Sequence, residues 1–176
     1  MTSELFSASD STLMSSDGRV RPTEPLTPVA SRQTAVPLEG RERIAWRLAA
    51  LTLVLRSCRG RSATLEQLHV LLWALRDHRN AQVLQQRWEH PDNQNVLRAY
   101  DPRLDDTLSL AKAVGLVGQL GTGRIVLSEL GGRVADRVRG EEGLMEDERQ
   151  TLAALGSISE AAMWRRLGTP EKRGAA

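Results

Sequence analysis

A glycine-rich stretch, GLVGQLGTGRIVLSELGGRV from Gly115 to Val134, constrains the fold of this chain more than any other segment. Glycines this close together either cradle a phosphate group or turn the chain. A dinucleotide loop needs the order strand, glycines, helix, and after Gly121 and Gly123 it would need a third glycine where Val126 stands. The order here is helix, glycines, strand, and no Gly-Lys-Ser or Gly-Lys-Thr triplet follows. The stretch therefore does not predict a nucleotide site.

The same stretch predicts a β-hairpin between two helices. Residues 116–120 and 124–127 have the apolar character of short strands, and Gly121-Thr-Gly123 is expected to supply the positive-φ positions of the turn between them. Asp101-Pro102 is a helix start signal, and Gly115 is a helix C′ glycine, so a helix is expected over 102–114. Ser128 is expected to cap the next helix.

Gly131 and Gly132 weaken that next helix, each by up to about 1 kcal/mol relative to alanine. Close approach of the helix to a neighbouring segment is the expected reason for them.

Two further helices are predicted on the N-terminal side, over 41–57 and 64–77, the second opened by a capping box of Thr64 and Gln67. The chain is therefore predicted to be mainly α with a small β-hairpin, as a winged-helix domain over residues 41–140. An insertion at about 79–100 contains another helical stretch. Residues 141–176 are expected to form a C-terminal helical extension. Residues 1–40 are rich in Ser, Thr and Pro and predict a disordered or extended tail.

The charge pattern indicates candidate DNA contacts. The net charge is only +2, but residues 41–100 hold ten arginines against five acidic residues. In DNA-binding winged helices the third helix, here 102–114, enters the major groove, and Asp105 and Asp106 near its start would repel phosphates. The candidate contacts are Arg59, Arg61, Arg103, Lys112 and Arg124. A merely solvated surface is the alternative interpretation.

Large side chains provide candidate partner contacts, which are Trp46, Trp73, Trp88, Trp164 and Arg165. For Trp164, packing against its own domain is the alternative.

The sequence holds no pattern typical of catalysis. His69, His78 and His90 lack metal-ligand spacing, and we expect His69 to be a satisfied core histidine. Cys58 lies among apolar helix residues and is expected to be a buried, unreactive thiol. We therefore predict a protein that is not an enzyme, with no catalytic residue, metal, cofactor or small-molecule substrate. A single cysteine and the lack of a leader or a long apolar run indicate a cytoplasmic protein without membrane contact.

Three segments carry a more specific resemblance: RIAWRLAALTLVLRSC, LEQLHVLLWALRD, and LDDTLSLAKAVGLV followed by GRIVLSELGGRVADRV. Over about residues 41–167 the chain resembles the middle components of bacterial ABC three-component, Lamassu-type anti-phage defence systems, and also kleisin-interacting winged-helix subunits of SMC complexes. The resemblance implies a non-catalytic accessory subunit that binds and regulates an SMC-like ATPase, with DNA contact through the complex, and restrains a nuclease-type effector. A free-standing winged-helix transcription regulator is the alternative.

Overall fold

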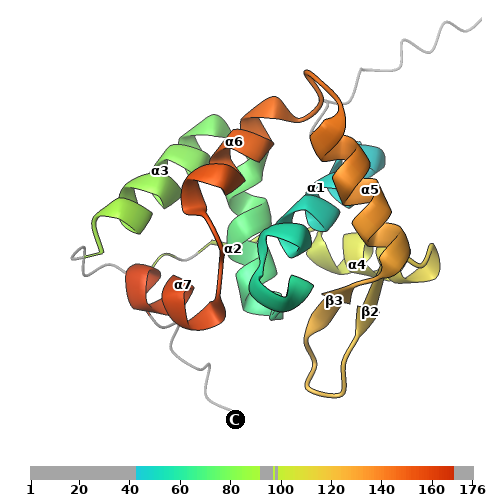
Figure 1. Ribbon diagram of the computed structural model, residues 1–176. Helices are drawn as coiled ribbons and strands as arrows, with labels where there is room; N and C mark the ends of the chain where they lie inside the picture. Colours follow the sequence, from blue (N-terminus) through green and yellow to red (C-terminus); the bar gives the residue numbers. More distant parts are fainter. Residues whose placement is uncertain (1–42, 92–96, 98, 169–176) are drawn as a thin grey trace, which may run out of the picture. The chain divides into compact units, whose positions relative to one another are not determined.

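The computed structural model describes residues 43–91, 97 and 99–168, so the predicted tail over 1–40 lies outside the described residues. Helix α1 (Ile44–Ser57) packs against α2 (Leu65–Arg76), α4 (Leu104–Ala113), α5 (Glu129–Gly140) and α6 (Glu146–Leu155) (Figure 1). Leu51, Val54 and Leu55 of α1 are completely buried. The almost wholly apolar sequence of α1 thus reflects its contacts with four other helices, although Ile44 at its start is half exposed.

The remaining helices cover the other side of α2. Helix α3 (His78–Glu89) packs against α2 and α6, and α7 (Glu160–Leu167) packs against α3 (Figure 1). The helical stretch predicted within the insertion is therefore present as α3. None of the helices in the described part of the chain is long and apolar enough to cross a membrane. The fold is mainly helical, as predicted.

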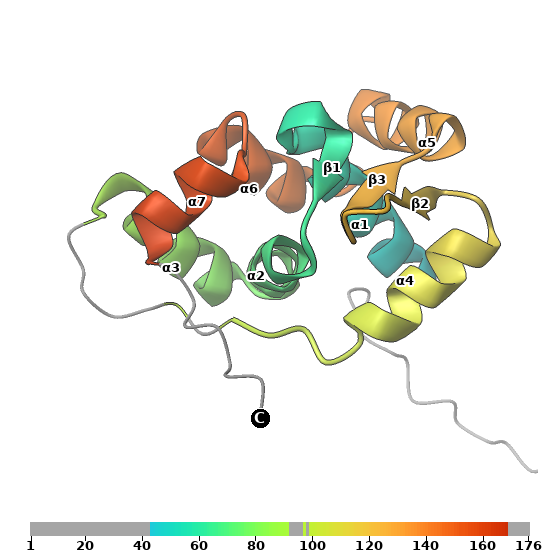
Figure 2. The ribbon, with the colours of Figure 1, turned by 90° about the horizontal axis from the view of Figure 1, so that it is seen from below.

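A small antiparallel sheet has the strand order β1-β3-β2. The predicted hairpin is confirmed as β2 (Val117–Gln119) and β3 (Ile125–Leu127), with Val117 opposite Leu127. The third strand, β1 (Ser62–Ala63), was not predicted and pairs with β3 (Figure 2). A strand of two small residues has no alternating apolar pattern, and it exists because β3 offers a pairing edge.

The glycine-rich stretch is explained by its backbone. Gly115 has a φ of +74°. Its N–H and that of Leu116 donate to the carbonyls of Lys112 and Ala111, the two bonds of a Schellman motif. In the hairpin turn only Gly123, with a φ of +80°, needs the left-handed conformation, so the expectation for Gly121 was wrong on this point. The helix end and the turn thus rest on two of these glycines.

Local side-chain caps set the starts of two helices. The capping box is confirmed, because the Gln67 N–H donates to Thr64 Oγ1 at 3.3 Å and Thr64 N–H donates to Gln67 Oε1 at 3.0 Å. Ser128 Oγ accepts from the Gly131 N–H at 2.9 Å, as expected for the cap of α5. Helix α5 closely approaches the Leu116 carbonyl at Gly131, where a Cβ atom would collide with it. The expected close approach is not found at Gly132 among the described residues.

The C-terminal helices belong to the same core. Ile158, between α6 and α7, is completely buried and forms a parallel bridge with Cys58 at the end of α1. Met163 of α7 is also completely buried. The acidic segment GEEGLMEDER at the start of this extension was expected to open a helix that includes Leu144, but α6 begins only at Glu146, and Leu144 is 43% exposed.

Candidate nucleic-acid and partner interface

The outer face of α4 mixes acidic and basic side chains. Arg103 and Lys112 are exposed near its two ends, and Asp105 and Asp106 are exposed in its first turn. Lys112 Nζ donates to Gln119 Oε1 of β2 at 2.7 Å, so this cation also ties the helix to the hairpin. Phosphates approaching α4 would therefore meet two carboxylates at the end where DNA-reading helices contact bases.

Arg124, the candidate DNA contact at the hairpin, is bound within the protein. Its Nη1 lies 2.6 Å from Glu160 Oε2 of α7, and its Nη2 and Nε donate to the carbonyl and hydroxyl oxygens of Ser62. The guanidinium of Arg124, directly before β3, thus connects the hairpin with β1 and α7. A phosphate would have to compete with these bonds, so an Arg124→Glu variant would disturb the hairpin as well as any DNA contact.

Arg59 and Arg61 lie together on a turn, η2 (Arg59–Arg61), that follows α1. The Arg61 N–H donates to the Cys58 carbonyl at 3.0 Å, and the Arg59 N–H donates to the Ile158 carbonyl at 2.8 Å. Both side chains are exposed. The turn and α4 lie on different sides of the domain (Figure 2). The structure therefore separates Arg59 and Arg61 from Arg103 and Lys112.

A buried ion pair fixes the start of α4. Arg47 Nη2 lies 2.7 Å from Asp101 Oδ2, and the two side chains are 3% and 1% exposed. Arg47 Nε also donates to Thr107 Oγ1 at 2.9 Å. The sequence does not predict this pair, because an arginine among the apolar residues of α1 is the only signal for it.

Asp101 has a different role from the predicted N-cap. Helix α4 begins at Leu104 rather than at Pro102, with Arg103 as its N-cap residue. Asp101 Oδ1 accepts from the Arg103 N–H at 3.1 Å, and the Asp101 carbonyl accepts from the Leu104 N–H. Asp101 thus caps a turn that leads into the helix, while its other carboxylate oxygen binds Arg47.

His69 completes this polar cluster. Its Nδ1 accepts from the Asp101 N–H at 3.3 Å, and its ring stacks on Tyr100 with the centroids 4.5 Å apart. His69 is thus hydrogen-bonded, as expected, but it is only partly buried and is not one of the buried core residues. The cluster joins α1, α2 and the start of α4. It therefore sets the position of the α4 face, which is the exposed side with Arg103, Asp105, Asp106 and Lys112.

The tryptophans are held mainly by the protein itself. Trp88 is 7% exposed within the core, and the Arg166 guanidinium lies 4.9 Å from its ring centroid. Trp46 Nε1 donates to Glu148 Oε1 at 3.2 Å. Trp73 and Trp164 are partly buried and pack against the core. Arg165 is exposed on α7. Trp88 is thus a core residue rather than a contact residue, and partner contact by the others stays a prediction.

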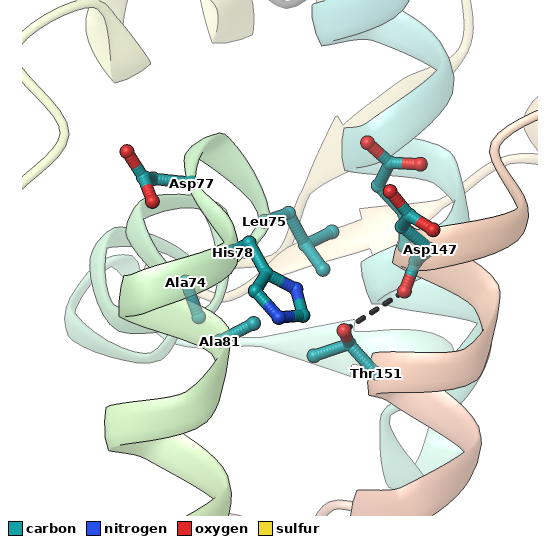
Figure 3. Close-up of a pocket in the computed structure, with 8 residues that line it drawn as sticks. Ala74, Leu75, Asp77, His78, Ala81, Asp147 and Thr151 are labelled. Carbon is teal, nitrogen blue, oxygen red and sulfur yellow. Dashed lines mark hydrogen bonds between the residues drawn. The ribbon is translucent and has the colours of Figure 1, made fainter.

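A small cavity lies between the α2–α3 corner and α6 (Figure 3). Its volume is about 10 Å³, close to the space that one water molecule needs. The His78 ring points toward it from α3, and Thr151 Oγ1 donates to the Asp147 carbonyl at 2.8 Å on the α6 side (Figure 3). Among the described residues no group of three or more His, Cys, Asp or Glu side chains is placed to hold a metal ion. The cavity is too small for an organic substrate.

Comparison of the chain with models of protein families, with curated proteins and with solved structures gives no match. The winged-helix assignment and the resemblance to defence-system subunits therefore remain predictions from the residues.

Cys58 is expected to react very slowly in the folded protein. Burial raises the pKa of its thiol from 9.0 to about 12, and Arg124 opposes this shift only in part. At pH 8 this leaves roughly a thousandfold less thiolate than an ordinary cysteine has. Labelling of this single cysteine with a thiol-specific disulfide reagent should be slow in buffer and fast in denaturant. Equal rates in both would show that the bridge to Ile158 opens readily.

Proposed function

We propose that residues 43–140 form a winged-helix domain and that the chain is a non-catalytic accessory subunit. The order α1, β1, α2, α4, β2, β3 and the strand order β1-β3-β2 support the winged-helix assignment. Helix α3 then lies in the predicted insertion. In this proposal the chain binds an SMC-like ATPase in a cytoplasmic anti-phage defence complex, and nuclease activity belongs to the effector. The identity of the partner rests on the resemblance of the sequence.

One observation favours a protein partner over a base-reading role for α4. Asp105 and Asp106 are exposed in the first turn of α4, where a DNA-reading winged helix places its base contacts. Two exposed carboxylates at the start of the helix are better suited to a basic protein surface than to phosphates.

Affinity purification of the tagged chain from cells that produce it tests the proposal. We expect an ATPase with a coiled coil to be recovered with the unmodified protein. Replacing Asp105 and Asp106 with asparagine should reduce that recovery several-fold, since it removes the two carboxylate charges at the start of α4. The matched control replaces Glu141 and Glu142 with glutamine; both are exposed before α6, and the control should keep normal recovery.

The alternative, a free-standing transcription regulator, predicts a different result. In that case the asparagine variant should bind DNA more tightly, because two carboxylates no longer repel phosphates. A homodimer that footprints its own promoter, recovered without an ATPase, would contradict the accessory-subunit proposal.

A further inference from the structure

A groove of about 460 Å³ lies between the end of α1, the end of α5 and α6. Arg56, Arg139 and Arg149 line it, each from a different helix, together with Glu146. Leu53 and Leu152 form part of the lining but are only 2% and 4% exposed. The accessible surface of the groove is therefore provided largely by charged and polar groups.

The groove arginines differ in how strongly they are bound within the protein. Arg56 Nε lies 2.9 Å from Asp136 Oδ1, and Arg149 Nη2 lies 3.0 Å from Glu146 Oε2. Arg139 is exposed, and within the described residues its side chain makes no hydrogen bond or ion pair. Arg139 is thus the groove cation that a ligand can engage without breaking an internal bond.

The turn with Arg59 and Arg61 continues this surface. Ser57 and Gly156 line the groove, and two residues further along each segment the Arg59 N–H donates to the Ile158 carbonyl. We call Arg56, Arg59, Arg61, Arg139 and Arg149 together the basic face. Helices α5 and α6 lie along one edge of the view from below and α4 lies toward the other, so the basic face is separate from the α4 face (Figure 2).

We infer that the basic face binds the phosphate backbone of duplex DNA without reading its sequence. Guanidinium groups bind phosphates through paired N–H donors, and cations from several elements match the spaced charges of a duplex. Two carboxylates of this face, Asp136 and Glu146, pair with Arg56 and Arg149. Glu141 and Glu142 are exposed just beyond Arg139, and the Glu141 carbonyl accepts from Arg149 Nη1 at 2.8 Å, so among the described residues the five arginines exceed these four carboxylates by one. The α4 face, with Asp105 and Asp106 beside Arg103 and Lys112, has no such excess.

Two other occupants fit the groove less well. Proteins that bind single strands stack bases on aromatic side chains, and none of the described residues that line this groove is aromatic. Peptides that dock as helices insert apolar side chains, and the nearly covered Leu53 and Leu152 offer little apolar surface for them. The inference does not depend on the ATPase proposal, because the basic face lies within this chain.

Fluorescence anisotropy of the full-length chain with a labelled duplex of about 20 base pairs, over about 50 to 200 mM salt, tests the inference. An Arg59→Glu/Arg139→Glu variant should bind at least about tenfold more weakly, with a salt slope shallower by about 2. An Arg103→Glu/Lys112→Glu variant makes the same charge change at α4 and should keep the slope. If charge reversal unfolds the protein, Arg59→Gln/Arg139→Gln with the matching glutamines at Arg103 and Lys112 repeats the comparison.

Three results would overturn the inference. The first is that the unmodified chain does not bind the duplex. The second is that the two variants lose the same amount of duplex affinity. The third is that polyglutamate displaces the labelled duplex at a lower charge concentration than unlabelled duplex does. The last would assign the basic face to an acidic protein segment. No ATPase is present in this assay, so a failure to bind the duplex would not contradict the accessory-subunit proposal. Conversely, a failure to recover an ATPase in the affinity purification would not contradict duplex binding.

Discussion

An Asp101→Ala variant is expected to lose about 3–5 kcal/mol of unfolding free energy, because it leaves the buried guanidinium of Arg47 without its counter-charge. Arg47 is 3% exposed, so water cannot replace the missing carboxylate without local rearrangement. The variant also removes the acceptor for the Arg103 N–H at the start of α4. Urea denaturation followed by far-UV circular dichroism measures the loss.

Two further variants separate the ion pair from a general effect of substitution. Glu129→Ala breaks an exposed ion pair with Arg133 on α5 and should cost less than about 1 kcal/mol. Arg47→Met combined with Asp101→Ala should recover part of the loss, since no lone buried charge remains. If Asp101→Ala costs no more than Glu129→Ala, the Arg47–Asp101 pair does not hold α4 in place.

Features determined by neighbouring residues could be predicted from the sequence. The Thr64–Gln67 box, the C′ role of Gly115 and the Ser128 cap each depend on groups within three to five residues along the chain. Such bonds need only the right residue types at a fixed spacing, which the sequence displays directly. The helix, hairpin, helix order of the glycine-rich stretch followed from these signals.

Contacts between distant segments could not be predicted in the same way. Arg47 and Asp101 are 54 residues apart, and Arg124 and Glu160 are 36 apart. In a single sequence, many charged residues are equally suitable partners for each of these side chains. Strand β1 was missed for the same reason, because its pairing with β3 provides the only cause for its conformation.

The candidate sites show the same division. Arg59 and Arg61 were identified from local charge, since they are two residues apart in one turn. Their continuation into a groove with Arg56, Arg139 and Arg149 depends on how three helices pack. Likewise, the sequence identifies Arg124 only as a cation of the hairpin. Its bonds to Ser62 and Glu160, which link the hairpin to β1 and α7, depend on the packing of distant segments.

Alanine at Gly131 and at Gly132 should change stability in opposite directions. A Cβ at Gly131 would lie less than 3.0 Å from both the Leu116 carbonyl oxygen and Leu127 Cδ1. The carbonyl belongs to the backbone and also accepts from the Ser128 N–H, so it cannot swing away as a side chain would. We expect Gly131→Ala to lose about 3 kcal/mol of unfolding free energy, at the upper end of overpacking effects.

Gly132→Ala is the matched control, one residue further along the same helix. A Cβ there meets nothing within 4 Å, and its φ is not positive, so alanine should stabilise α5 by up to about 1 kcal/mol. Urea denaturation of both variants gives the comparison. Equal and small effects would mean that α5 does not approach Leu116 closely, and the glycine pair would then have no packing role in joining α5 to the hairpin.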